Sequence, residues 1–326
     1  MAEDDIHQPH DKLFKAGFGD PANAAAFLCG QLPAALSAVI GWDHLQAEPG
    51  SFVDSHYRHS ESDLLFSAPV HGRPGLLYVL FEHQLKCDPW IALRLLRYMV
   101  RIWERHLRDH PEAVSLPVIV PVVLAQNSEA WELAPSFAPL VDIPTAADGV
   151  ARAFVPDFAF RLIQLAELPF GEISGTPAGI LILRVLKAAR AGKLLGEEVW
   201  DESLIQDAPG IFEAILRYIL SQGDVDKAAF TARVKSIHNL EIQQNAMTLA
   251  EQFRQEGRQE GRQEGRQEGL VLAQQKAVLD ALAIRFDEVP QGLCEAIGMI
   301  RDESRLRALF KAAIQASSLE DFARSL

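Results

Sequence analysis

Polar residues able to bind a metal ion or a phosphate follow directly on a strongly apolar stretch of the chain. The run from Leu76 to Phe81 holds six consecutive apolar residues, and Glu82, His83, Gln84 and Lys86 come after it. A continuous apolar run of this length is typical of a strand that is buried on both faces. Because alternate residues of a strand share a face, we expect Glu82, Gln84 and Lys86 to project to the same side.

A second strand is predicted just before this one. Residues 63–68 (DLLFSA) are β-compatible and are separated from the apolar run by PVHGRPG, whose glycines and proline favour a turn. The simplest pairing is a hairpin, which would place Asp63 beside Glu82. Two carboxylates and a nitrogen donor would then converge, and such a set can hold Mg²⁺ and hydrolyse a phosphodiester. The alternative, solvent-facing residues at the ends of strands, stays open on spacing alone.

A long helix is predicted after the apolar strand, with Asp88 as its N-cap and Pro89 at its first position. One face of this helix carries arginines at intervals of three and four residues, and another face carries apolar residues that we expect to pack on the sheet. The arginines, called the arginine stripe below, either bind phosphates or form a solvated face that Glu104 and Asp109 partly neutralise. The stripe comprises Arg94, Arg97, Arg101, Arg105 and Arg108, and the apolar face comprises Leu93, Leu96, Val100, Trp103 and Leu107.

Composition limits the classes of function. The formal net charge of −13 over 326 residues argues against indiscriminate nucleic-acid binding, so any such contact must be concentrated in a local basic surface. The three cysteines lack the spacing of zinc sites or disulfide frameworks, which indicates free thiols in a reducing compartment. The acidic, polar N-terminus does not resemble a signal peptide, and no membrane-spanning run is found, so we expect a cytoplasmic protein without membrane contact. No GxxxxGK loop or GxSxG motif occurs.

The remaining elements are read from periodicity and turn residues. Residues 9–47 indicate helices joined by short turns, and 116–126 form another strand candidate, in which Pro121 predicts an edge position or a bulge. From Pro156 onward the pattern is mainly helical, with stops at Gly192 and Gly223. Residues 270–326 read as a compact helical module whose final helix is capped by Ser317 or Ser318.

Four tandem RQEG copies occupy residues 254–269. A helix through them would place the four glycines in one slowly drifting stripe, and each glycine would cost about 1 kcal/mol relative to alanine. The repeat also places arginine next to arginine and glutamate next to glutamate at i,i+4, and repulsion between these like charges would weaken that helix further. Two interpretations follow: the glycine stripe packs two helices together in a dimer, or the segment is a solvated linker.

The order and spacing of several blocks carry a family resemblance. SDLLF, FEHQ and LRLLRYM, together with HDKLFKAGFGDPANAAAFL before them and SLPVIVPVVLAQNSEAW after them, resemble the core of the Rpn recombination-promoting nucleases, also described as YhgA-like transposases. The resemblance covers roughly residues 9–225, and the C-terminal module resembles a small helical domain of unknown function often appended to such proteins. We therefore expect a nuclease domain at 9–225, a helical linker at 226–269 and a small helical domain at 270–326.

The resemblance implies a PD-(D/E)xK nuclease fold, in which a small mixed sheet of restriction-endonuclease type is flanked by helices. Its two acids would be Asp63 and Glu82, and the carbonyl of His83 would be a further ligand for Mg²⁺, Mn²⁺ or Ca²⁺. Gln84 stands at the position of the motif lysine, so it can orient a water molecule but brings no positive charge, which Lys86 could supply. The His-Gly that often follows the Pro-rich strand is replaced by Gln126 and Asn127, and Asp11 is the candidate for an additional acid on the first helix.

The functional prediction is a metal-dependent DNA endonuclease linked to recombination or mobile elements. In this prediction Asp63, Glu82, Gln84 and Lys86 form the catalytic set. The residues expected to contact the DNA backbone are Arg94, Arg97, Arg101 and Arg105. The alternative is a catalytically weak, nuclease-like DNA-binding or regulatory protein that forms homo-oligomers through its C-terminal region.

Overall fold

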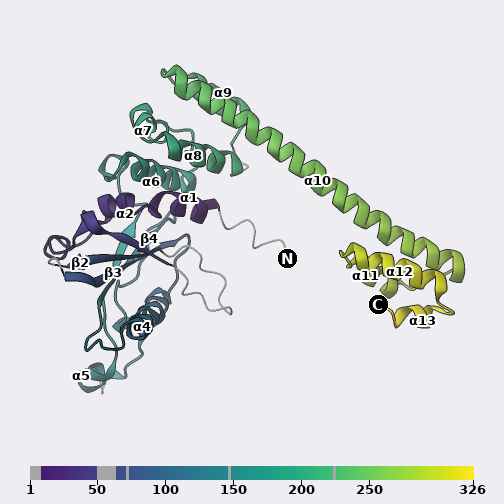
Figure 1. Cartoon of the computed structure of the whole chain (residues 1–326), viewed down its shortest axis with the longest axis horizontal. Coiled ribbons are helices and arrows are strands. Elements are labelled where there is room, and N and C mark those ends of the chain that lie inside the picture. The colour runs from purple at the N-terminus through teal and green to yellow at the C-terminus, as the bar shows by residue number, and fades with distance from the viewer. Residues whose placement is uncertain (1–8, 50–63, 71–72, 146–147, 223–224) are drawn as a thin grey trace. The chain divides into compact units, whose positions relative to one another are not determined.

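A mixed sheet of five strands organises the first part of the chain. The structure, a computed structural model, describes residues 9–49, 64–70, 73–145, 148–222 and 225–326 (Figure 1). The strands lie in the order β1-β2-β3-β4-β5; β1 to β3 pair antiparallel, and β3 to β5 pair parallel. The predicted hairpin is therefore confirmed as β2 and β3. The bounds are β1 Gln46–Glu48, β2 Leu64–Val70, β3 Arg73–Gln84, β4 Val118–Ala125 and β5 Arg161–Gln164.

Pro121 does not mark an edge strand. β4 lies between β3 and β5, so the prediction of an edge position is wrong for the strand as a whole. Pro121 pairs with Leu80 of β3, whereas the pairing of β4 with β5 begins one residue later, at Val122 and Arg161. The proline is tolerated in a central strand because it precedes the stretch in which β4 has strand partners on both sides.

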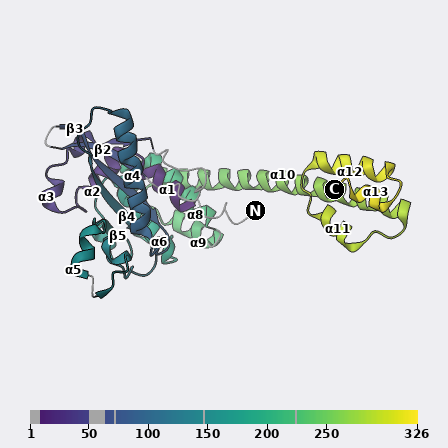
Figure 2. The same cartoon turned by 90° about the horizontal axis from the view of Figure 1, so that it is seen from below.

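Helices cover both faces of this sheet (Figures 1 and 2). On one face, α1 packs with α2, α6 and α8, and the ring of Phe81 in β3 contacts the rings of Phe14, Phe18 and Phe27 at centroid distances of 5.0 to 6.2 Å. The other face is covered by α4. The bounds are α1 Pro9–Phe18, α2 Pro21–Leu28, α4 Ile91–Asp109, α6 Pro177–Arg190 and α8 Pro209–Ser221. The expected mixed α/β fold with flanking helices is confirmed.

The helix α4 is oriented differently from the sequence prediction. Its buried residues are Ile91, Ala92, Leu95, Met99 and Ile102, which join Leu65, Ile119, Val123 and Ala125 of the sheet in one core cluster. Val100 and Leu107, which we expected to pack on the sheet, are 42% and 46% exposed. Leu93, Leu96 and Trp103 are partly buried, because residues between Trp131 and Phe160 also pack against this cluster. Apolar residues therefore occur on more than one side of α4.

The start of α4 also differs. The helix begins at Ile91 rather than at Pro89, and Trp90 is its N-cap residue. Asp88 is not the N-cap; its Oδ1 accepts a hydrogen bond of 2.8 Å from the backbone N–H of Trp90, and its Oδ2 lies 3.1 Å from a terminal nitrogen of Arg94. Asp88 thus stabilises the turn that precedes the helix.

Short elements complete the first part of the chain. The strand β5, sequence RLIQ, was missed because four residues are too short to show a period. The predicted stop at Gly192 is confirmed, since this residue has φ +65 just after α6, whereas Gly223 lies outside the described residues. The further bounds are α3 Ala34–Ser37, η1 Trp42–His44, η2 Ala138–Leu140, α5 Asp148–Ala151, η4 Arg152–Phe154, η5 Phe170–Glu172, α7 Glu202–Asp207 and α9 Lys227–Lys235.

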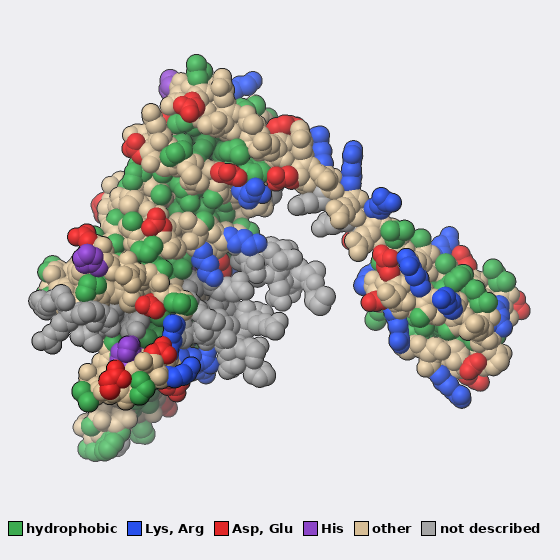
Figure 3. All heavy atoms as spheres, viewed as in Figure 1, with side chains coloured by type: hydrophobic (Ala, Val, Ile, Leu, Met, Phe, Trp, Pro, Cys, Tyr) green, Lys and Arg blue, Asp and Glu red, His purple; other side chains and the backbone are tan. Residues whose placement is uncertain are grey.

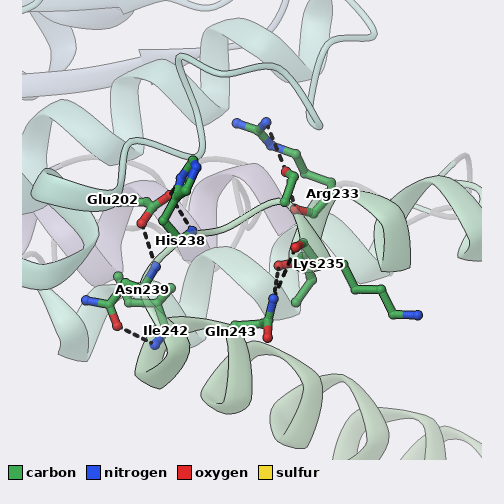
Figure 4. Close-up of polar contacts among 9 residues, drawn as sticks. Glu202, Arg233, Lys235, His238, Asn239, Ile242 and Gln243 are labelled. Atoms are coloured by element: carbon green, nitrogen blue, oxygen red, sulfur yellow. Dashed lines mark hydrogen bonds and ion pairs between the residues drawn. The ribbon is translucent and has the colours of Figure 1, made fainter.

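A carboxylate fixes the corner between α9 and the next helix, α10 (Leu240–Phe286; Figure 4). The two oxygens of Glu202 accept hydrogen bonds from the backbone N–H groups of His238 and Asn239, at 2.9 and 2.8 Å. Asn239 Oδ1 in turn accepts from the N–H of Ile242, and Gln243 Nε2 donates to the carbonyl of Lys235 at 3.1 Å. The start of α10 is thereby tied to α7 and to the end of α9.

We expect Glu202→Gln to weaken this corner and to remove a pH dependence from it. The hydrogen bonds from the backbone of His238 and Asn239 hold the pKa of Glu202 below its ordinary value of 4.5. A lowered carboxyl pKa stabilises the fold fully above pH 4.5, and this contribution disappears as the pH falls through the folded-state value. Thermal melts from about pH 3 to about pH 7 should show a wild-type advantage over Glu202→Gln at neutral pH that vanishes at low pH. An equal difference at every pH would contradict this account.

The chain divides into two compact units, Met1–Ala250 and Glu251–Leu326. α10 is continuous through the RQEG copies, and a Cβ placed on any of the four repeat glycines would meet nothing within 4 Å. Within this chain the glycine stripe therefore has no packing role among the described residues. The predicted domain boundaries at 225 and 269 stay a prediction.

The second unit is a small helical bundle. The C-terminal half of α10 packs with α11 Gln291–Gly298, α12 Glu303–Gln315 and α13 Leu319–Ala323 around a core that includes Val278, Leu282, Ile297, Leu306, Leu309 and Phe322. Gln275 is buried, and its Nε2 donates to the carbonyls of Gly298 and Ile300. Ser318 caps α13 by accepting from the N–H of Asp321, as predicted. None of the helices in the described ranges is long and apolar enough to span a membrane.

Candidate functional site

In the sequence, the two predicted acids flank the residue pair of β2 and β3 that lies farthest from their connecting turn. The register pairs Leu64 with Phe81, and Glu82 continues β3 with its backbone opposite Val123 of β4. Asp63 lies outside the described residues, and the side chain of Glu82 is likewise not described. The placement of their carboxylates relative to each other therefore stays a prediction.

His83 belongs to a buried polar network on the α1 face of the sheet. The residue is 2% exposed, and its ring stacks on the ring of Phe14 at a centroid distance of 5.0 Å. Its Nδ1 lies 2.9 Å from Asp11 Oδ1, and its Nε2 lies 2.6 Å from Gln126 Oε1. The imidazole is therefore a packing and hydrogen-bonding group. Asp11, the candidate additional acid, contacts the imidazole ring through its Oδ1.

Gln126 is the centre of the network. The residue is 1% exposed and directly follows β4; its backbone N–H donates to the carbonyl of Gln84 at 2.8 Å. Its Nε2 donates to the carbonyl of Leu186 in α6 at 2.7 Å, which fixes the orientation of the amide. The amide oxygen is thereby turned to His83. Gln126 thus connects the ends of β3 and β4 to α6.

His10 and Tyr218 extend the network to α8. His10 Nδ1 lies 2.6 Å from the hydroxyl of Tyr218 and 3.1 Å from Gln126 Nε2. Burial raises the pKa of the Tyr218 hydroxyl above its ordinary value, so this group stays protonated and can donate to His10. Nothing in the spacing of these residues along the sequence indicates that they meet, because 116 positions separate His10 from Gln126 and 208 separate it from Tyr218.

Two basic residues at the end of α6 hold the carboxyl ends of the parallel strands. Arg190 donates from Nε to the carbonyl of Gln126 and from Nη2 to the carbonyl of Leu85, at 3.1 and 2.9 Å. Lys187 donates to the carbonyls of Leu165 and Ala166, both at 2.7 Å, and burial lowers its pKa. These contacts were not predicted, although basic residues in the last turn of a helix are a usable signal for them. They fix the sheet edge from which Gln84 and Lys86 emerge.

The predicted phosphate-binding residues line one side of α4. Lys86 and Arg97 are exposed, Arg94 forms an ion pair with Asp88, and Arg105 forms one with Asp109 at 3.4 Å. Figure 3 shows Lys and Arg side chains gathered over α4, with Asp and Glu side chains beside them. The surface is thus locally basic in an acidic protein, and it adjoins the turn that leaves β3.

The oxygen donors predicted for a metal ion suit a hard divalent cation. Two carboxylates and a backbone carbonyl are ligands that Mg²⁺, Mn²⁺ and Ca²⁺ accept. Among the side chains that the structure describes, no cluster of three or more His, Cys, Asp and Glu could hold a metal ion. The side chains predicted to bind a metal ion, those of Asp63 and Glu82, are not among those described.

Comparison with known proteins finds a matching family model and several relatives. Residues 8–206 match the family model described as "Putative transposase, YhgA-like". The chain is 29% identical over 260 residues to the recombination-promoting nuclease RpnA of Escherichia coli K12, covering 79% of this chain and 87% of the relative. It is 30% identical over 258 residues to RpnC of the same strain, covering 76% and 82%.

A further relative carries a different label. The protein RpnE of Escherichia coli K12, 28% identical over 263 residues, is named an inactive recombination-promoting nuclease-like protein; the match covers 79% of this chain and 85% of RpnE. No solved structure matches the chain.

Proposed function

The chain belongs to the YhgA-like transposase family, and on this basis and on the geometry of β2 and β3 we propose that it is a divalent-metal-dependent DNA endonuclease. Relatives that align over most of their length are named recombination-promoting nucleases. The proposed role is phosphodiester hydrolysis linked to recombination or mobile elements.

The observation that carries the proposal is the register of the hairpin. Leu64 and Phe81 are paired, and in the sequence Asp63 precedes Leu64 and Glu82 follows Phe81. In an antiparallel pair, residues opposite each other have Cβ atoms about 4.5 to 5.5 Å apart. This register supports a shared site for Asp63 and Glu82 if the pairing continues by one residue. The arrangement of an antiparallel hairpin followed by a helix and a parallel strand also supports the PD-(D/E)xK assignment.

In this proposal Asp63, Glu82 and the carbonyl of His83 hold the metal ion. The bound ion, Mg²⁺ or alternatively Mn²⁺ or Ca²⁺, would supply a water molecule of lowered pKa and stabilise charge on the phosphate. Gln84 orients that water, and Lys86 offers the positive charge that the glutamine lacks. Arg94, Arg97, Arg101 and Arg105 bind the DNA backbone, which fixes position without reading sequence.

Removing the metal should abolish cleavage. We expect purified full-length protein to nick supercoiled plasmid in Mg²⁺ or Mn²⁺, and to leave it intact in excess EDTA, because the proposed mechanism generates hydroxide at neutral pH only through the bound ion. Restoring Mg²⁺ after EDTA should restore nicking. Cleavage that persists in EDTA would contradict metal dependence, and the absence of cleavage under every condition would contradict the enzyme assignment.

The second candidate is a nuclease-like protein without strong cleavage that binds DNA or regulates an active relative. It is favoured by Gln84 at the lysine position and by relatives whose names mark them as inactive. Retained DNA binding with no cleavage in any metal would select this candidate.

We also propose that the C-terminal region forms homo-oligomers. Support comes from the exposed glycine stripe on α10 and from exposed apolar residues of the second unit, among them Met299 and Ile284, which are 78% and 83% exposed. Light scattering on the full chain and on Gly261→Arg should show an oligomer that the substitution weakens, since a bulky charge would block close packing of two helices. A monomeric wild-type chain would contradict the proposal.

A further inference from the structure

The most exposed tryptophan of the chain lies beside the predicted active site. Trp90 is 58% exposed, whereas Trp131 and Trp200 are each 4% exposed. The indole N–H groups of Trp42 and Trp103 donate to the carbonyls of Ser37 and Pro117, so these two are held inside the fold. Trp90 alone among the five presents most of its surface to solvent. Because a large aromatic side chain gains free energy when it is covered, this exposure makes Trp90 a candidate contact residue.

The backbone of Trp90 is held firmly. Its N–H donates to Asp88 Oδ1 at 2.8 Å, and its carbonyl accepts from the N–H of Arg94 at 3.0 Å. The ion pair between Asp88 and Arg94 closes the same turn. The ring is therefore presented from a fixed backbone position, which reduces the conformational entropy lost on binding.

Trp90 also continues the arginine stripe. It precedes Arg94 by four residues and Arg97 by seven, and the hydrogen bond from Arg94 to its carbonyl extends the helical geometry to it. At about 100° per residue these three positions share one face of the helix. Lys86, exposed in the turn after β3, lies four residues before Trp90 in the sequence. An aromatic ring flanked by cations is the combination by which proteins bind single-stranded nucleic acid.

We propose that Trp90 is a base-stacking residue and that the surface formed by Lys86, Trp90, Arg94 and Arg97 binds DNA with an unpaired segment. The exposed cations Lys86 and Arg97 bind phosphates, and the indole stacks on an unpaired base, which a fully paired duplex cannot offer without extruding a nucleotide. The inference rests on the proposed DNA substrate and names its class: single-stranded DNA, or duplex with a frayed end, gap or flap. The exposed face of a tryptophan can also bind a protein, but the neighbouring positive charges favour a polyanion.

The test measures binding without cleavage. Full-length wild type, Trp90→Leu, Trp90→Phe and Val100→Ala are titrated in EDTA against fluorescein-labelled oligothymidylate and against a blunt duplex. Val100 is the matched control because it is exposed on α4 but lies off the stripe. Thermal melts establish that each variant is folded.

We expect wild type to bind the single strand more tightly than the duplex, and Trp90→Leu to lose about tenfold on the single strand while changing little on the duplex. Trp90→Phe should retain most of the affinity, and Val100→Ala all of it. Tryptophan fluorescence should be quenched by oligothymidylate in wild type and much less in Trp90→Phe.

Two results would overturn the inference alone: single-strand binding by Trp90→Leu equal to that of wild type, or equal losses on both probes, which would indicate a general effect on the surface. If the wild-type chain cleaves duplex plasmid and Trp90→Leu gives either of these results, the proposed function still holds. A chain that binds neither probe would contradict both proposals.

Discussion

Glu82→Ala should reduce metal-dependent plasmid cleavage at least about a hundredfold. Substitutions of residues that merely orient metal ligands typically cost about 10- to 100-fold, so removal of a carboxylate that binds the metal directly should cost more. Asp63→Ala should have a similar effect, because the two acids are proposed to share one ion. DNA binding should be retained in both variants, since the arginine stripe proposed to bind the backbone is unchanged. Initial nicking rates on supercoiled plasmid measure the effect.

The matched control for this prediction is Glu104→Ala. Glu104 is an exposed acid on α4, and its removal changes the net charge by the same amount without altering the proposed site. If Glu104→Ala and Glu82→Ala lose activity equally, the loss reflects general electrostatics. If Glu82→Ala retains wild-type cleavage, the acid that binds the metal has been misplaced.

Gln126→Leu should destabilise the first unit by about 3 kcal/mol. The substitution keeps the side chain's approximate size but leaves His83 Nε2 and the carbonyl of Leu186 buried without these partners, and each unsatisfied buried group costs about 1 to 3 kcal/mol. For a unit of this size the melting temperature should fall by about 6 to 12 °C. Differential scanning calorimetry of the full chain measures the change.

Two further variants separate the network from a general packing effect. Asn127→Ala alters the next residue, which hydrogen-bonds locally to the carbonyl of Glu129, and should change the melting temperature little. The double variant His83→Leu with Gln126→Leu should be less destabilised than the sum of the single variants, because the penalty of one unpaired partner is removed with it. Additive losses would contradict a network.

The hairpin could be predicted from the sequence because its signals are local. A continuous apolar run, a second β-compatible run and turn formers between them lie close together in the sequence, so no distant contact is needed to recognise them. The N-cap of α13 at Ser318 is local for the same reason. The proposed pairing of Asp63 with Glu82 rests on that register, in which Leu64 pairs with Phe81.

The orientation of α4 could not be predicted in the same way. A helix that contacts only a sheet has one apolar side, but α4 also meets residues between Trp131 and Phe160, so Trp103 and Ile102 are both covered although they face different directions. Similarly, Pro121 indicated an edge strand. β5 pairs with β4 only from Val122 onward, and this could not be read from the sequence because β5 has only four residues.

The buried network was missed for a different reason. Gln126 looked like a departure from the family pattern, and its role depends on His83, Leu186 and His10, which come from three other parts of the chain. A polar residue at the end of an apolar strand can be exposed or buried, and only its partners decide which. The network ties His83, the residue after Glu82 in β3, to α1, so it would support the proposed site from the α1 face.

The most direct test of the central claim, a divalent-metal site formed by Asp63 and Glu82, is a calorimetric titration of the DNA-free protein with Mn²⁺. The account predicts a saturable site in wild type that is lost in Asp63→Ala and in Glu82→Ala, while Glu104→Ala binds as wild type does. Mn²⁺ binding that is unchanged in both acid variants, or no binding by wild type, would contradict it.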